Sequence, residues 1–189
     1  MIVRYLLLSL LFILLAYFIF RKVVRKDYRK RQRLSAISYL LETFVFGAHA
    51  NFIYLALPAA WPSFPPFPDD KLRMISAGIL FGCGVVLLLC AWFKLGTRRS
   101  FGMDRNKLVT TGLYRFSRNP QLLGYGLLLA GVTVVYFSWM VFAWFLLYII
   151  ASAFMIQSEE EFLKQKYRGE YEEYCKRVPR IIGYRKTKK

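Results

Sequence analysis

A short polar segment at the start of an apolar run carries residue types suited to binding an anion. Arg118, Asn119 and Pro120 stand just before an apolar stretch that begins at Leu122. Asparagine is favoured at the N-cap of a helix and proline at its first position, so a helix is predicted to start here. Its free N–H groups, together with the planar Arg118 guanidinium, suit a carboxylate or phosphate. The alternative role for this arginine is an ordinary interfacial anchor.

A run of three glutamates, Glu159 to Glu161, is the second candidate. It follows an apolar stretch in a chain with 28 basic and only 11 acidic residues. Carboxylates in this position can accept hydrogen bonds from ribose hydroxyls or offset a cationic ligand, and we favour that role for Glu159 and Glu160. An amphipathic pattern instead predicts that three later acids face water: Glu170, Glu172 and Glu173. Its apolar side is predicted to pack through four aromatic residues: Phe162, Tyr167, Tyr171 and Tyr174.

Five apolar stretches must position these groups. The predicted membrane spans are residues 2–20, 35–60, 74–93, 122–137 and 139–156. Only helices satisfy their backbone locally in hydrocarbon, so the sequence predicts an all-α integral membrane protein with a cytoplasmic C-terminal helical segment, as one domain over residues 1–189. Glycines of the third and fourth spans are predicted to allow close helix packing: Gly78, Gly82, Gly124, Gly126 and Gly131.

The composition combines strong hydrophobicity with strong positive charge, which is unusual for a soluble domain. Apolar residues make up 57% of the 189 residues, yet the formal net charge is +17. Residues 21–33, 94–118 and 157–189 hold 25 of the 28 basic side chains. By the positive-inside rule these segments lie in the cytoplasm. We therefore predict that the N-terminus is outside and that the candidate site and the C-terminus are cytoplasmic.

Other kinds of site have less support in the sequence. One histidine and three scattered cysteines form no metal-binding or disulfide pattern, so we expect no metal. The basic residues flank membrane ends without a nucleic-acid motif, so we expect no nucleic-acid partner. Glu42 and His49 share a face of the second span and are weaker functional candidates. The basic tract of residues 21–33 fixes topology, with binding of anionic lipid headgroups as an alternative role.

The ordered motifs of residues 108–179 resemble those of the isoprenylcysteine carboxyl methyltransferase and phospholipid N-methyltransferase superfamily of integral-membrane enzymes. The family pattern L-V-x-x-G-x-Y reads LVTTGLY, and its R-H-P or R-N-P triplet reads Arg118-Asn119-Pro120. The acidic pair at a membrane end is Glu159-Glu160, and the later E-Y-x-x-Y-x-x-x-V reads EYEEYCKRV. Each motif is weak alone, and the resemblance depends on their order and spacing.

The resemblance implies S-adenosylmethionine as methyl donor and a lipid or lipidated acceptor, either a prenylcysteine carboxylate or a phospholipid amine. It implies a cofactor-binding part made of residues 94–121 and 155–182. Arg118, Glu159 and Glu160 are the expected catalytic residues. The expected donor-binding residues are Leu108, Val109, Gly112, Tyr114, Arg118, Asn119, Pro120, Tyr125, Glu159 and Glu160. The acceptor is expected to enter sideways from the bilayer, and the donor from the cytoplasm.

Several positions depart from the family pattern. Asn119 replaces the histidine of the prenylcysteine branch, and Leu122 replaces the usual aromatic residue, with Tyr125 one turn on as a replacement. Met155 stands where the family has an arginine that would suit an acceptor carboxylate. The resemblance therefore supports the methyltransferase class more strongly than it supports prenylcysteine as the acceptor.

Two other classes of function remain open at this level. The sterol and steroid reductases have a similar C-terminal half, which Lys166-Tyr167 and Tyr174-Cys175 resemble, and would imply NADPH as cofactor. A non-enzymatic membrane adaptor or small transporter subunit is the second alternative. The sequence shows no internal repeats or broken helices that would indicate a transporter.

Overall fold

The computed structural model describes residues 2–96 and 108–182, and every regular element in these ranges is helical. The first three elements run on from one another as a continuous helical rod. The elements are α1 (Ile2–Phe18), the π-helical η1 (Ile19–Val24), α2 (Arg25–Arg31), α3 (Ala36–Phe52), the 3₁₀ turn η2 (Ile53–Leu55), α4 (Lys71–Leu95), the 3₁₀ turn η3 (Gly112–Arg115), α6 (Pro120–Val135) and α7 (Trp139–Arg177).

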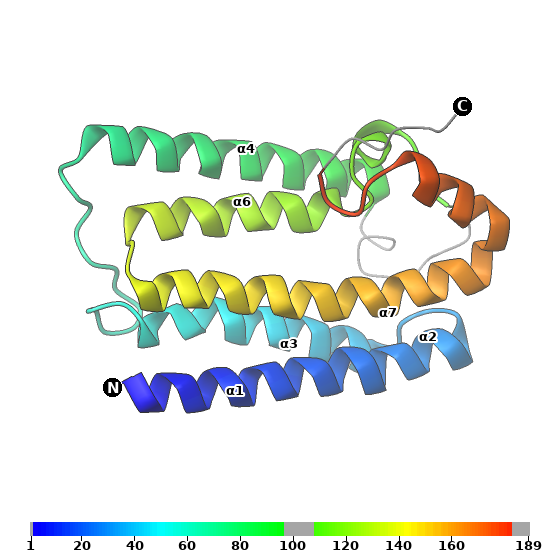
Figure 1. Cartoon of the computed structure of the whole chain (residues 1–189), viewed down its shortest axis with the longest axis horizontal. Coiled ribbons are helices and arrows are strands. Elements are labelled where there is room, and N and C mark those ends of the chain that lie inside the picture. The colour runs from blue at the N-terminus through cyan, green and yellow to red at the C-terminus, as the bar shows by residue number, and fades with distance from the viewer. Residues whose placement is uncertain (1, 97–107, 183–189) are drawn as a thin grey trace.

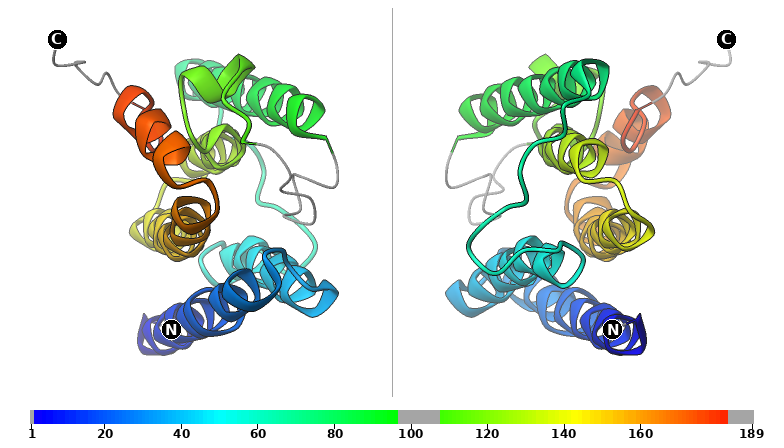
Figure 2. Two further views of the ribbon diagram at one scale, coloured as in Figure 1. Left: turned by 90° about the vertical axis from the view of Figure 1, so that its right-hand side faces the viewer. Right: turned by 90° about the vertical axis from the view of Figure 1, so that its left-hand side faces the viewer.

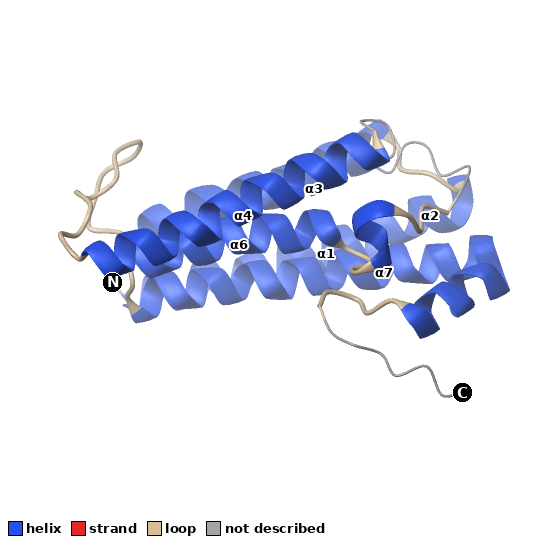
Figure 3. Cartoon of the chain, turned by 90° about the horizontal axis from the view of Figure 1, so that it is seen from above, coloured by secondary structure: helices blue, strands red, loops and turns tan. Residues whose placement is uncertain are grey.

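The long helices lie side by side in three layers (Figures 1, 2 and 3). α4 and α6 form one outer layer, α7 lies in the middle, and α1 and α3 form the other. A core between α1, α3 and α7 includes Phe12, Val45 and Leu147. A second core joins α6 and α7 to α3 through Leu129 and Trp144. The all-α prediction is confirmed for the described residues.

The prediction of five membrane spans is wrong in number, judged by the length and apolarity of the helices. Within the described residues, three helices are long and apolar enough to cross a membrane: Ile2–Arg31, Lys71–Leu95 and Trp139–Arg177. α6 has 16 residues, or about 24 Å, against about 30 Å of hydrocarbon. α3 ends at Phe52 instead of reaching residue 60. All five long helices lie where the sequence predicted them, but α3 and α6 are too short to count as membrane spans.

The charged segments gather at one end of the helical layers. α2, the C-terminal end of α4, the start of α6 and the far end of α7 lie together there (Figure 1). The proline-rich connection between η2 and α4 and the turn between α6 and α7 lie at the opposite end. Along α1 and α4 many large apolar side chains are exposed, among them Leu7, Leu14, Ile79 and Phe93. Such apolar faces suit contact with lipid and indicate a membrane protein.

Close packing of α4 on α6 depends on glycines, but only partly on those predicted. A Cβ added at Gly84 would lie 2.7 Å from the Gly124 carbonyl oxygen, and one at Gly124 would lie 2.9 Å from the Gly84 oxygen. Gly131 is equally tight, 3.0 Å from the Ala77 oxygen. The prediction for Gly78 and Gly82 is wrong, because an added Cβ at either would meet nothing within 4 Å. Their spacing matches a packing motif, but they face away from α6.

His49, considered as a functional candidate from the sequence, has a structural role. It is fully buried, and its Nε2 lies 2.9 Å from the Trp144 carbonyl oxygen. The two rings stack at 4.9 Å, and the Trp144 indole N–H donates to the His49 carbonyl at 2.7 Å. These contacts fasten α3 to α7.

Glu161 fastens α7 to the first helical rod. Its two oxygens accept hydrogen bonds from Arg21 at 2.6 Å and Arg25 at 2.5 Å. Partial burial acts to raise the pKa of Glu161, but the hydrogen bonds and charges of the two arginines outweigh it and lower that pKa. These ion pairs therefore stabilise the fold at pH values above the ordinary carboxyl pKa. The stabilisation is lost as pH falls through the lowered pKa of Glu161.

This pairing predicts a pH-dependent effect of Glu161→Gln. At pH 7 the variant should unfold at a lower temperature than the wild type, because two arginines lose their carboxylate. At about pH 3 the difference should shrink, since protonation removes the same charge from the wild type. Thermal unfolding in detergent at both pH values measures the gap, with the exposed Glu172→Gln as control. A gap that does not change with pH would contradict the assignment.

Candidate active site

A reversal in α7 brings residues 169–182, the returning segment, back over the start of α6. Arg168 has φ 44° and ψ −123°, which no helical residue adopts, and the next residue is Gly169. Figure 1 shows α7 turning there, so that its last turns lie beside the start of α6. The positive φ at a non-glycine residue is strained, so the packing of the returning segment must hold it in place.

The returning segment is hydrogen-bonded to the start of α6. The backbone N–H of Arg118 donates to the Pro179 carbonyl at 3.0 Å, and the Asn119 side-chain amide donates to the Arg180 carbonyl at 2.8 Å. Pro120 occupies the first turn of α6 as predicted, and Asn119 holds the N-cap position. The predicted N-cap position of Asn119 is confirmed, but its side chain makes no capping bond and binds the Arg180 carbonyl instead.

Arg118, Glu160 and Arg180 form a buried charge cluster where these segments meet. A guanidinium nitrogen of Arg118 lies 2.9 Å from Oε1 of Glu160, and the two side chains are 6% and 8% exposed. Arg180, which is half exposed, binds the same carboxylate through both of its oxygens, at 3.0 and 2.6 Å. Its pKa is raised, chiefly by the hydrogen bonds to Glu160. Two cations therefore share one carboxylate, and the cluster is net positive.

Polar side chains from the returning segment complete the surroundings of Arg118. Its guanidinium donates to the Tyr171 hydroxyl at 3.2 Å and also contacts the Cys175 sulfur. Burial raises the pKa of the Tyr171 hydroxyl, Glu160 raises it further, and Arg118 opposes both, so the hydroxyl stays protonated near neutral pH. Nε of Arg118 is buried and has no hydrogen-bond partner within residues 2–96 and 108–182. This N–H is available to a polar group of a ligand.

Two of the predicted donor-binding residues before α6, Leu108 and Tyr114, contact the same returning segment. Leu108 packs against the cluster of Tyr171, Tyr174 and Val178. The carbonyl of Tyr114 accepts a hydrogen bond from the Tyr174 hydroxyl at 2.6 Å. Gly112 begins η3 with φ +64°, a left-handed conformation that suits glycine. Val109 lies in the irregular segment between Leu108 and Gly112 and is half-buried. Residues 97–107 of the predicted cofactor-binding part lie outside the described residues.

Two other predicted residues differ in their placement. Glu159 is half-buried next to Glu160, and its charge contributes to raising the pKa of Tyr171, so it belongs to the neighbourhood of the cluster. Tyr125 packs instead against Tyr148, at 5.3 Å between ring centroids, and against Phe46 of α3. The structure thus brings most of the predicted residues to one place but leaves Tyr125 in the core between helices.

An apolar groove of about 400 Å³ opens between α6 and α7 beside this cluster. Aliphatic and aromatic side chains line it from both helices: Leu122, Leu123, Leu127, Phe145, Ile149 and Ile156. Arg180 and Ile181 of the returning segment line it too. Arg180 is therefore shared between the charge cluster and the apolar groove.

Sequence reasoning missed one member of the cluster, Arg180, and also Tyr171 and Cys175, two side chains that contact Arg118. Tyr171 and Cys175 are four residues apart and so share a helix face. Tyr171 was interpreted as packing only, and Cys175 was considered only in the resemblance to the reductases. Arg180 follows the end of α7, and nothing in its local sequence indicates a partner twenty residues earlier. Tertiary structure alone pairs it with Glu160.

The fold and the cluster define a small helical membrane protein with an anion-suited site beside an apolar groove. The sequence pattern of the phospholipid methyltransferase family matches residues 72–170, just over half of the chain. The chain therefore belongs to the phospholipid methyltransferase family, a family of membrane methyltransferases. The matched part runs from α4 to the reversal in α7 and includes Arg118 and Glu160. No curated protein and no solved structure matches the chain.

Proposed function

We propose that this protein transfers the methyl group of S-adenosylmethionine to a lipid amine held at the α6–α7 groove. The single observation that carries the proposal is the position of Arg180, which lines the apolar groove and also binds Glu160 of the buried cluster. A site for a polar donor and a groove for a lipid chain thus meet at one side chain. A lipid methyltransferase needs these two sites in contact.

The residues present fit the donor. S-adenosylmethionine carries a carboxylate, ribose hydroxyls and a sulfonium cation. The unpartnered Nε of Arg118 and the Arg180 guanidinium suit the carboxylate. A carboxylate accepts about four hydrogen bonds. Glu160 accepts two from Arg180 and forms an ion pair with Arg118 through Oε1, which leaves Oε2 able to accept one from a hydroxyl. Glu159 adds a second acidic group that offsets positive charge.

When bound, the donor supplies a methyl group on a positively charged sulfur, which a nucleophile displaces in line. The contribution of this chain is to align donor and acceptor and to exclude water. Arg118 and Glu160 hold the donor at the start of α6, and the groove holds the lipid chain so that its headgroup lies at Arg180. A protonated amine must lose its proton before it attacks, and a carboxylate oxygen of Glu159 takes it.

An amine is favoured over a prenylcysteine carboxylate as the acceptor. Met155, at the position of the family's arginine, packs half-buried against the core between α1, α3 and α7 and offers no cation. The charged end of the molecule faces the cytoplasm by the positive-inside rule, so the donor enters from that side and the N-terminus lies outside.

The proposal is tested by methyl transfer with the purified protein in detergent. The donor carries a labelled methyl group, and phosphatidylethanolamine and a farnesylated cysteine are offered as separate acceptors. We expect label in phosphatidylethanolamine. Label only in the farnesylated cysteine would contradict the amine assignment, and label in neither acceptor would contradict both proposed acceptors.

The groove makes a separate prediction about the acceptor. Ala153 lines the groove on α7, and Ala153→Phe places a ring in the space assigned to the lipid chain. The KM for phosphatidylethanolamine should rise about tenfold, whereas the affinity for S-adenosylhomocysteine should stay unchanged. Leu146→Phe is the matched control, because Leu146 lies on the same helix, is exposed and is outside the groove lining. Equal KM values in the two variants would place the acceptor elsewhere.

A further inference from the structure

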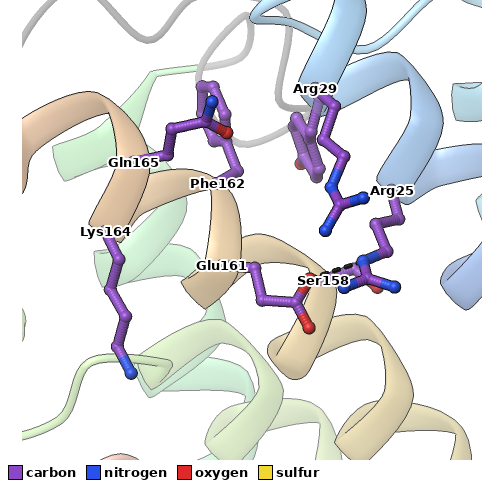
Figure 4. A pocket seen from close by; sticks show the side chains of 8 residues that line it. Arg25, Arg29, Ser158, Glu161, Phe162, Lys164 and Gln165 are labelled. Atoms are coloured by element: carbon purple, nitrogen blue, oxygen red, sulfur yellow. Dashed lines mark hydrogen bonds and ion pairs between the residues drawn. The ribbon is translucent and has the colours of Figure 1, made fainter.

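A second cavity, of about 320 Å³, lies between α2 and α7 on another side of α7 (Figure 4). Three basic residues line it, Arg25, Arg29 and Lys164, with Gln165 and Glu161. Figure 4 shows Arg25 and Arg29 extending from α2 toward α7, while Lys164 extends away from the cavity. The stacked rings of Tyr28 and Phe162, 4.6 Å apart, lie behind it.

The charged side chains around this cavity carry a net positive charge. Both oxygens of Glu161 are occupied by Arg21 and Arg25, so one acid is already shared by two cations. The side chain of Arg29 makes no hydrogen bond or ion pair with any residue of the described ranges 2–96 and 108–182. Its guanidinium therefore presents an unused planar donor, next to Arg25, to any anion that enters.

The cavity lies at the depth of lipid headgroups. The first apolar stretch ends at Phe20 and the last at Ile156. Arg25 and Glu161 are each five residues further on, which is about 7 Å along a helix. The headgroup region on one side of a bilayer is about as thick as this. A phosphate in the headgroup layer would therefore meet the cavity at the level of Arg25, with Arg29 about one helical turn further from the hydrocarbon.

We propose that the α2–α7 cavity binds the phosphate of an anionic phospholipid headgroup, at a site separate from the methyl-transfer site. Successive glutamates on α7 divide the two sites. Glu160 points to Arg118 and Arg180, and Glu161 points to the α2 side. Arg29 donates to the phosphate, Arg25 adds its charge, and the amide of Gln165, which also lines the cavity, binds a headgroup hydroxyl.

The test is lipid binding to the purified full-length protein in a neutral detergent, followed by native mass spectrometry. The probes are dioctanoyl phosphatidylglycerol, dioctanoyl phosphatidylcholine and inorganic phosphate. Phosphatidylglycerol should bind saturably and more tightly than phosphatidylcholine. Arg29→Gln should weaken it about fivefold, the effect of one basic residue near a membrane surface. Lys30→Gln, which removes the same charge from the next and exposed position outside the cavity, should leave it unchanged.

Three outcomes would overturn the proposal. Equal weakening by both variants would mean that the lipid responds to the charge of the whole basic tract. No weakening by Arg29→Gln would place the lipid elsewhere. Inorganic phosphate that binds as tightly as phosphatidylglycerol would reject a lipid ligand in favour of a free anion.

Binding of S-adenosylhomocysteine to Arg29→Gln separates this site from the proposed methyl-transfer site. It should equal that of the wild type, and a loss would contradict two separate sites. Because the lipid probe needs no donor, the result stands even if the wild type binds no S-adenosylhomocysteine.

Discussion

Glu160→Gln should abolish most of the affinity for S-adenosylhomocysteine and also destabilise the fold. Glutamine keeps the shape of the side chain but not the charge that offsets Arg118, which is almost fully buried. Removing one partner of a buried ion pair leaves an uncompensated charge, at a cost of about 3 kcal/mol in the free energy of unfolding. The affinity should fall at least about tenfold, since the donor loses a charged hydrogen-bond acceptor.

Glu173→Gln is the matched control for this prediction. Glu173 lies on the same helix, and its ion pairs with Lys176 and Arg177 are exposed. Its substitution should change the free energy of unfolding by less than about 1 kcal/mol and leave binding intact. Calorimetry and thermal unfolding in detergent measure both quantities. Wild-type affinity in Glu160→Gln would show that the buried cluster is not the donor site.

Gly84→Ala should destabilise the fold more than the addition of a methyl group at any other position in the membrane helices. The added Cβ would lie 2.7 Å from the Gly124 carbonyl oxygen and 2.9 Å from the Leu128 nitrogen. Both are backbone atoms, so α4 and α6 must separate. Such overpacking costs about 1–3 kcal/mol. Because α6 starts at the candidate site, binding of S-adenosylhomocysteine should weaken as well.

Gly82→Ala on the same helix should have the opposite sign. An added Cβ there meets nothing within 4 Å, and replacing glycine by alanine within a helix stabilises by up to about 1 kcal/mol. Thermal unfolding of the two variants in the same detergent makes the comparison. A shift in the same direction for both would mean that α4 and α6 do not pack as described.

The sequence was sufficient to locate the helices but not their ends or their contacts. Apolar runs of about twenty residues predict a helix wherever they occur, and Pro120 marks a helix start because its missing N–H costs nothing there. The extent of α3 was overestimated because apolar residues continue beyond its last helical turn, and α6 starts and ends two residues earlier than predicted. The Gly78–Gly82 spacing was misleading in a similar way, since a spacing motif does not say which face of a helix meets a neighbour.

The candidate site was predictable only where local patterns indicate chemistry. The types and order of Arg118, Glu159 and Glu160 singled them out, and the structure brings Arg118 and Glu160 to 2.9 Å. The participation of Tyr171 and Arg180 depends on the reversal at Arg168. No proline marks that reversal, and Gly169 is only a weak signal beside it. Such a contact forms only when the chain folds back and brings two distant segments together. It cannot be inferred from either segment alone.

The most direct test of the central claim is calorimetry of the wild-type protein in detergent with S-adenosylhomocysteine and with NADPH. Methyl transfer at the Arg118–Glu160 cluster predicts saturable binding of S-adenosylhomocysteine and no binding of NADPH. Binding of NADPH alone would contradict it and favour a reductase. Binding of neither by a folded protein would contradict a donor site of this kind.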